Sequence, residues 1–199
     1  MRLENYKIIF IAISLIGVLL LSSPALDAVL RLPSSEPFSE LYLLGPGHVA
    51  ENYPYNTVPG RNYAVFIGVT NHLGSSALYM VYLKVLNQTD LLPNAITGEP
   101  SSLLPVYQYE FSVPDNQTWE APLAFSVANV STTQNQTIVN EFAINGVTLH
   151  IDKPIDWDSN SNTFSYELVC ELWLYNGTVN AFQYHNRFVG LQLNVTETS

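Results

Sequence analysis

Apolar and polar residues alternate along most of the chain after residue 37, and this two-residue period predicts β-strands. The clearest runs are RNYAVFIGVTNH at 61–72, ALYMVYLKVLN at 77–87 and TFSYELVCELWLY at 163–175. In each run nearly every second residue is apolar, as expected for a strand with one face in a core. The turn sequence NHLGSS at 71–76 separates the first two runs, and we predict that they pair as a hairpin.

Further segments of the same kind follow at 106–113, 121–130 and 140–151. Within the last of these, Asn145-Gly146 is the dipeptide best suited to a tight hairpin turn. A final strand within 179–195 follows the turn Asn176-Gly177-Thr178. Seven or eight strands without intervening helices predict an all-β fold, an immunoglobulin-like antiparallel sandwich, with a closed barrel as the alternative.

The N-terminal region has a different pattern, because fourteen residues from Ile8 to Leu21 are apolar or weakly polar without interruption. A helix from Tyr6 to Leu26 would be about 30 Å long, the thickness of a hydrocarbon core. Arg2 and Lys7 precede the run, which favours a cytoplasmic N-terminus and an extracytoplasmic remainder. The alternative is a cleaved signal peptide, because Ser23-Pro24-Ala25 offers small residues near a cleavage point.

These patterns predict three parts. Residues 1–30 form a cytoplasmic tail and a single transmembrane helix, residues 31–37 a polar tether, and residues 38–199 the extracytoplasmic β-sandwich. The segment 91–105 contains three prolines and no periodicity, which predicts a surface loop. The expected location is the cell membrane, with one membrane pass.

Composition narrows the possible partners. Hydrophobic residues make up 47% of the chain and charged residues 12%, and the formal net charge is −10. A chain of this sign repels phosphate backbones, so nucleic acid is not an expected partner. Six Asn-x-Ser/Thr sequons are consistent with an exported and glycosylated domain, although such sequences also occur as simple turns. They lie at Asn87, Asn116, Asn129, Asn135, Asn176 and Asn194.

Residues that could carry chemistry are few and scattered. Cys170 shares a strand face with apolar residues and is expected to be a core thiol. Gly45-Pro46-Gly47-His48 reads as a turn, and the four histidines show no metal-ligand spacing. In the segment 152–162, Asp158, Asn160 and Asn162 alternate like calcium ligands, but a solvated hairpin loop is the preferred interpretation, and no metal or other cofactor is predicted. The sequence therefore favours a protein that is not an enzyme.

One stretch resembles a known family. The run FSELYLLGP, from Phe38 to Pro46, is followed by Tyr53-Pro54, Gly60 and the strand end Val69 to His72. Over about 35 residues this is similar to an archaeal family described only as domain of unknown function 1616. The resemblance implies a membrane-tethered, outward-facing β-domain without a defined activity. It also favours a retained anchor, although family members commonly carry several membrane helices and this sequence predicts one.

The function predicted from these features is a non-catalytic cell-envelope protein. Its glycosylated ectodomain would contact other envelope or membrane proteins, as an accessory subunit or as part of a homo-oligomer or surface assembly. The alternative is a carbohydrate-binding module or a glycan-acting surface enzyme. That alternative rests on the many aromatic residues and on Glu167 and Glu171, which share one strand face with Trp173.

Overall fold

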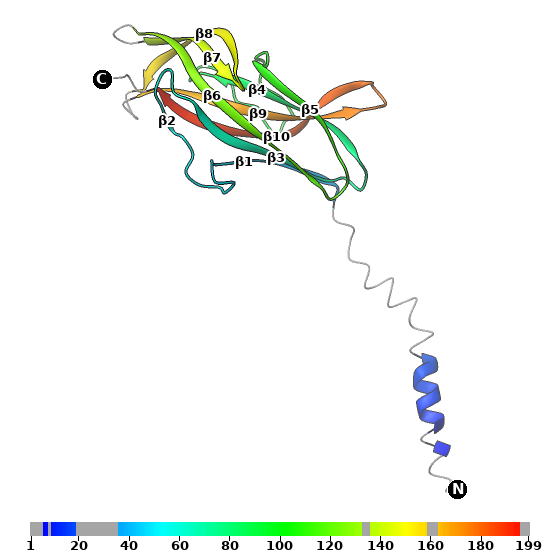
Figure 1. Cartoon of the computed structure of the whole chain (residues 1–199). Helices are drawn as coiled ribbons and strands as arrows, with labels where there is room; N and C mark the ends of the chain where they lie inside the picture. Colours follow the sequence, from blue (N-terminus) through cyan, green and yellow to red (C-terminus); the bar gives the residue numbers. More distant parts are fainter. Residues whose placement is uncertain (1–5, 8, 19–35, 133–135, 159–162, 196–199) are drawn as a thin grey trace. The chain divides into compact units, whose positions relative to one another are not determined.

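The computed structural model describes residues 6, 7, 9–18, 36–132, 136–158 and 163–195 (Figure 1). The chain divides into two compact units, residues 1–37 and residues 38–199. In the first unit, residues 6, 7 and 9–18 are helical. The larger apolar side chains of this helix are exposed.

The predicted membrane helix, Tyr6 to Leu26, is described only in part, because residues 8 and 19–26 lie outside the described residues. Within the described ranges, no helix combines the length and the apolar character needed to cross a membrane. The membrane anchor therefore stays a prediction from the sequence.

The second unit is all β, as predicted, but it has more strands than the expected seven or eight. Ten strands lie within its described residues: β1 (Phe38–Leu44), β2 (Asn56–Thr57), β3 (Tyr63–His72), β4 (Ala77–Leu86), β5 (Tyr107–Val113), β6 (Thr118–Thr132), β7 (Gln136–Ile144), β8 (Val147–Asp158), β9 (Thr163–Asn176) and β10 (Ala181–Val195). The count from sequence was too low partly because β2, with two residues, is too short to show any period.

The strands form two sheets that face each other across the core (Figure 1). One sheet has the order β1-β3-β6-β7-β8, and the other has the order β5-β4-β9-β10-β2. All neighbours are antiparallel except β2 and β10, which are parallel. The sheets are joined on one side through Trp157↔Phe164 and Asp158↔Thr163 of β8 and β9. On the other side, no pairing joins β1 to β10 among the described residues.

The predicted hairpin between 61–72 and 77–87 is wrong. β3 pairs with β1 and β6, whereas β4 pairs with β5 and β9, so the connection between β3 and β4 crosses from one sheet to the other. Alternation shows which face of a strand is buried but not which strand is its neighbour. Asn71 helps the chain to cross, because its Nδ2 donates to the carbonyl oxygens of Ser75 and Val113.

Two other connections agree with the sequence. β7 and β8 form the predicted hairpin, with Ile144 opposite Val147. Its turn residues Asn145 and Gly146 have φ angles of 50° and 81°, which is the left-handed conformation that an Asn-Gly hairpin turn requires. β9 and β10 form the second hairpin, with Asn176 opposite Ala181.

The core lies between the sheets and takes its side chains from the inward faces of both. Val65, Ile67 and Val69 of β3 are fully buried, as are Leu168 and Leu172 of β9. The free thiol of Cys170 is also fully buried, and burial raises its pKa to about 12. It is therefore a core residue, as predicted, because a thiol that stays protonated is a poor nucleophile.

Candidate binding cleft at the open seam

The side of the sandwich where β1 and β10 remain unpaired contains a cleft of about 500 Å³, which we call the seam cleft. This volume falls in the range of ligand pockets, roughly 300–1,000 Å³. Apolar side chains of the two edge strands line it: Leu41, Leu43, Val189 and Leu191. The remaining lining residues are Tyr42, Tyr53, Tyr55, Glu167, Gly190 and Gln192.

Backbone groups of both edge strands point into the seam. Tyr53 OH donates to the carbonyl oxygen of Leu43, so this oxygen points away from β3. Backbone groups two residues apart on a strand point to the same side, so those of Leu41 also face the seam. On β10, the N–H of Asn194 donates to Tyr55 O of the segment leading into β2, which places the backbone groups of Gly190 on the seam side.

Glu167 places a carboxylate at the cleft. It is half-buried on β9, and desolvation raises the pKa of its carboxyl above the usual range. Its Oε1 lies over Gly190, where an added Cβ would collide with it. Glycine therefore makes the room for this carboxylate. Within the described part of the chain, no cationic side chain forms an ion pair with Glu167.

The two edge strands, β1 and β10, are linked by hydrogen bonds near the start of β1. His185 Nε2 on β10 lies 3.1 Å from Ser39 Oγ, which lies 2.7 Å from Tyr79 OH. Tyr79 OH in turn donates to Asn71 Oδ1 at 3.1 Å. Since this phenol proton is used, the Ser39 hydroxyl can donate to Tyr79 and accept from His185, so the chain of hydrogen bonds runs in one direction.

The environment of this network fits a structural role. Ser39 is 1% exposed, and Tyr79 and Asn71 are fully buried, so the serine hydroxyl is closed to substrates. Desolvation, with the charge of Arg187 as a second cause, lowers the pKa of His185 below its ordinary value. Burial raises the pKa of Tyr79. The network therefore links β1 to β10 at one end of the seam through hydrogen bonds among largely buried polar groups.

The residues that carry the family resemblance meet in this region. Ser39 of β1 lies opposite Asn71 of β3. Phe38 stacks on the imidazole of His72 with ring centroids 4.6 Å apart, and His72 Nε2 lies 3.5 Å from Glu40 Oε1. The two halves of the motif are therefore neighbours on paired strands.

The rest of the motif shapes the loop after β1. A Cβ at Gly45 would collide with the carbonyl oxygen of Glu51, so only glycine allows this close approach of backbone. Tyr53 holds the returning chain against Leu43 through the bond described above. Gly60 has a φ of 80° and donates its N–H to Val127 O. The motif residues therefore fix the conformation of the loop that follows β1 beside the seam.

A second polar cluster lies on the outward face of β9, four residues from Glu167. Glu171 is fully buried and pairs with Lys84 Nζ at 2.8 Å, and Lys84 is only 3% exposed. The Glu171 carboxylate also accepts from the Ser101 N–H at 2.8 Å and from Trp173 Nε1 at 3.2 Å. Lys84 donates to Ser101 O at 2.7 Å. This pair therefore fixes the predicted loop 91–105 onto the sheet.

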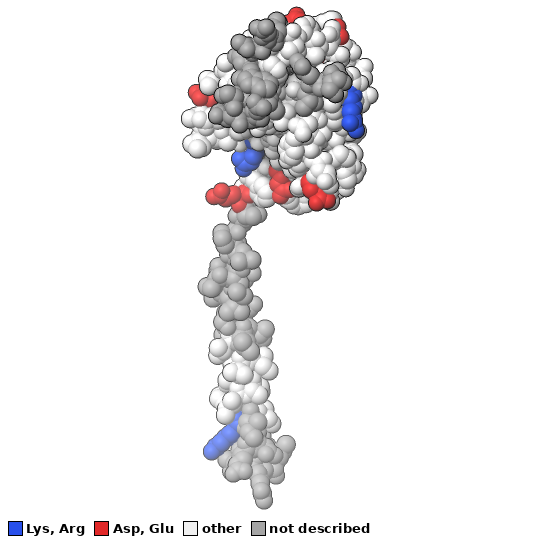
Figure 2. Space-filling model, turned by 90° about the vertical axis from the view of Figure 1, so that its left-hand side faces the viewer, with Lys and Arg blue, Asp and Glu red and all other residues white. Residues whose placement is uncertain are grey.

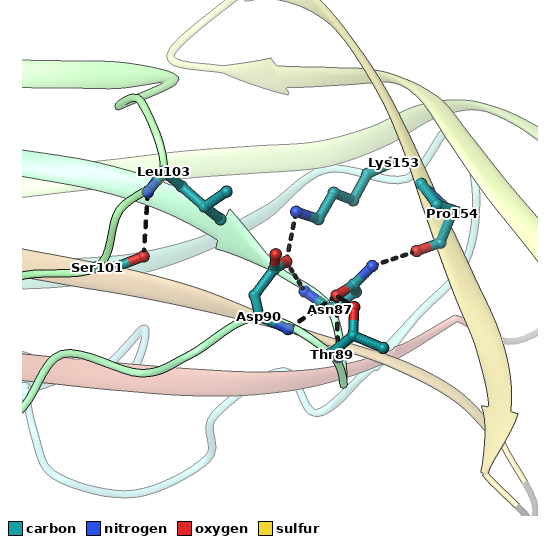
Figure 3. Close-up of polar contacts among 7 residues, drawn as sticks. All are labelled: Asn87, Thr89, Asp90, Ser101, Leu103, Lys153 and Pro154. Atoms are coloured by element: carbon teal, nitrogen blue, oxygen red, sulfur yellow. Dashed lines mark hydrogen bonds and ion pairs between the residues drawn. The ribbon is translucent and has the colours of Figure 1, made fainter.

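The start of this loop is held by a turn after β4 (Figure 3). Asn87 Oδ1 accepts from the N–H groups of Thr89 and Asp90, and Asn87 Nδ2 donates to Pro154 O at 2.9 Å. Asp90 forms an ion pair with Lys153. These contacts tie the loop to β8, so a predicted surface loop proves to be anchored at both ends.

The predicted sequons lie near strand ends. Asn116 and Asn129 are exposed, whereas Asn87, Asn176 and Asn194 are half-buried. None of these five lines the seam cleft. Asn135 lies outside the described residues.

The other candidate groups stay apart. His48 Nδ1 lies 2.6 Å from Glu120 Oε1, and His150 Nδ1 lies 3.4 Å from Glu141 Oε1. Within the described ranges, no three His, Cys, Asp or Glu side chains gather in a way that could hold a metal ion. Asp158 ends β8, but Asn160 and Asn162 of the acidic segment lie outside those ranges.

Charge is sparse on the described surface. Figure 2 shows one side, most of which is uncharged, with several Asp and Glu side chains near one another along its lower edge.

Comparison with solved structures finds similar chains at low identity. The CARDB domain of a Pyrococcus furiosus protein, in complex with di-metal ions, is 7% identical with a TM-score of 0.41, covering 83% of this chain and 94% of that one. A β-glucosidase from Listeria innocua in complex with glucose is 7% identical with a TM-score of 0.36, covering 80% of this chain and 16% of that one. A chain of the human seminal plasma complex of zinc 2-glycoprotein and prolactin inducible protein is 6% identical with a TM-score of 0.37, covering 84% and 100%.

A search of the curated proteins finds no match. A family model does match, the domain of unknown function DUF1616, over residues 32–139. This match confirms the resemblance inferred from the motif at Phe38 to Pro46 and covers more than half of the chain. The chain therefore belongs to the DUF1616 family.

Proposed function

We propose that this protein is a non-catalytic, membrane-anchored ectodomain of the cell envelope that makes contacts with other proteins. The apolar run from Ile8 to Leu21 supplies the anchor, and the sandwich supplies the contact surface. In this proposal the domain acts as an accessory subunit or within a surface assembly. Its immunoglobulin-like character rests on the order of the strands β4, β9 and β10 in one sheet.

One observation carries the proposal, which is the open seam. Unpaired strand edges attract other chains, and natural sheets usually cover or charge them. Here β1 pairs only with β3, and β10 meets β2 only at Asn194 and Val195, so both edges stay open along the cleft within the described residues. An apolar floor between two such edges favours association with another polypeptide.

The sequons support an exported domain whose glycans leave the seam free. A glycan at Asn116 or Asn129 would extend from an exposed site outside the cleft lining. Glycans at Asn87, Asn176 and Asn194 would start from half-buried side chains near strand ends.

Crosslinking on intact cells tests the proposal. A short amine- and carboxyl-reactive crosslinker should join the full chain to at least one neighbouring envelope protein or to another copy. Purification from membranes in mild detergent should then recover the same neighbour. Recovery of monomer alone in both experiments contradicts the proposal.

A carbohydrate-binding function is the second candidate, favoured by three tyrosines around one cleft. Tyr53 and Tyr55 lie with ring centroids 6.1 Å apart, and Tyr42 lines the same space with Glu167 and Gln192. Aromatic faces with nearby amide and carboxylate groups suit sugar binding. A glycan array probed with the full chain should show binding that Tyr55→Ala abolishes. An array without signal contradicts this second function.

A further inference from the structure

We propose that the seam cleft binds an extended segment of a partner protein as an added β-strand, with a lysine or arginine side chain of that segment directed at Glu167. This inference rests on the proposed function and specifies its site and the chemistry of its partner.

Backbone geometry provides the first argument. The hydrogen bond from Tyr53 to Leu43 O and the bond from Asn194 N–H to Tyr55 O fix which residues of each edge face the seam. By the two-residue period, Leu41 on β1 and Gly190 on β10 direct their N–H and C=O groups into the cleft. An extended chain is the ligand that can satisfy backbone donors and acceptors on such an edge.

Side-chain chemistry provides the second argument. Leu41 and Leu43 on one wall and Val189 and Leu191 on the other give apolar contacts. A strand places every second side chain on one face, so apolar residues two positions apart would meet these walls. The occupant is therefore an extended segment with alternating apolar side chains.

Charge complementarity provides the third argument and selects a basic occupant. Glu167 is partly desolvated at the cleft and lacks an ion-pair partner among the described residues, in contrast to the paired Glu171. A cation that enters the cleft would stabilise the charged carboxylate of Glu167, which has lost part of its stabilisation by water. An acidic side chain at the same place would be repelled.

Two capped heptapeptides test the proposal with the full chain in detergent micelles. The first, acetyl-Thr-Val-Thr-Val-Lys-Val-Thr-amide, presents three valines on the face that meets the apolar walls and its lysine on the opposite face, where Glu167 lies; the second has glutamate in place of lysine. Isothermal titration calorimetry should show binding of the lysine peptide only. Glu167→Gln should weaken this binding about tenfold.

Matched variants complete the design. Gly190→Ala should also weaken binding several-fold, because the new Cβ displaces the Glu167 carboxylate. Glu110→Gln removes an exposed carboxylate on β5, at the opposite edge of that sheet, and should leave binding unchanged. Thermal unfolding of each variant checks that the fold is kept.

Several results overturn the proposal. Equal binding of both peptides, no binding of either, or unchanged affinity in Glu167→Gln would each do so. Dimerisation of the full chain that Glu167→Gln abolishes, without peptide binding, would assign the cleft to a second copy instead. Failure of the peptides with neighbours still recovered by crosslinking on cells rejects this inference while leaving the proposed function intact.

Discussion

Two glutamates on one face of β9, four residues apart, have opposite surroundings. Glu171 is fully buried under the loop 91–105, and Lys84, Ser101 and Trp173 all contact its carboxylate. Glu167 is half-buried at the open seam, with an elevated pKa and no ion-pair partner among the described residues.

The difference separates a carboxylate that holds the fold from one that is available to a ligand. A buried charge is tolerated only when partners compensate it, and Glu171 has them. The carboxylate of Glu167 is also partly desolvated, but no cationic side chain among the described residues compensates its charge. Groups kept in this condition are candidates for binding, because a partner can supply what the fold does not.

The largest expected effect comes from uncoupling the buried pair. Glu171→Gln leaves Lys84 charged and buried, which should lower the free energy of unfolding by about 3–5 kcal/mol. Urea unfolding of the full chain measures it. The double variant Lys84→Met with Glu171→Leu should recover much of the loss, because no charge is then buried. A loss below about 1 kcal/mol in the single variant would show that the pair does not hold the loop.

The next largest effect on stability should come from the buried hydrogen-bond network of Asn71, Tyr79, Ser39 and His185. Asn71→Ala removes the acceptor of Tyr79 OH and the donor to Ser75 O and Val113 O, so the free energy of unfolding should fall by about 2–3 kcal/mol. Asn140→Ala is the control, since Asn140 makes an exposed bond to Ser131 Oγ. Equal effects in the two variants would contradict a specific role for the buried network.

A smaller effect should appear as a dependence of stability on pH. The pKa of His185 is lowered in the folded state, so between that value and the unfolded value of about 6.5 the unfolded chain binds more protons. Stability should therefore fall as pH drops below about 6.5, by at most about 1.4 kcal/mol per pH unit from this residue. His185→Gln should remove this part of the slope.

Denaturant unfolding between pH 5 and 8 measures the His185 contribution. His150→Gln serves as the matched control, because the side chain of His150 is 76% exposed. A slope that is the same in wild type and His185→Gln would show that the histidine does not titrate in this way.

The smallest expected effect is that of Glu167→Gln, and its sign is opposite to that of Glu171→Gln. Because the Glu167 pKa is raised, the folded state is penalised progressively as the pH rises above the unfolded value, and the penalty is complete once the pH exceeds the folded pKa. The neutral glutamine removes the penalty, so stability at pH 7 should rise, by less than about 1 kcal/mol after solvent screening. Clear destabilisation in this variant would place Glu167 among the structural carboxylates.

Much of the fold follows from alternation alone. Two features were predicted correctly: the strand face of β9 that contains Cys170 is buried, and Asn145-Gly146 forms the hairpin turn between β7 and β8. Both depend only on the local period and on turn chemistry. The pairing of β3 with β6, and not with β4, depends on contacts between distant segments. Alternation is the same for either partner, so the sequence could not choose.

The site was only partly visible in the sequence. Glu167 and Glu171 are correctly placed on one strand face, but their different surroundings depend on Lys84 and Gly190, which lie on other strands. A glycine within the alternating run VGLQLNV is a local sign that another group approaches closely. Which group approaches is a matter of tertiary structure.

Amide hydrogen exchange, followed residue by residue by NMR, tests the open seam most directly. Fast exchange is expected at Leu41 and Gly190, whose N–H groups face the cleft, and slow exchange at Tyr42 and Leu191, whose N–H groups face neighbouring strands. The lysine peptide should slow exchange at Leu41 and Gly190 and leave exchange at Tyr42 and Leu191 unchanged. Slow exchange at these two residues in the free protein, or no change when the peptide is added, would contradict the account.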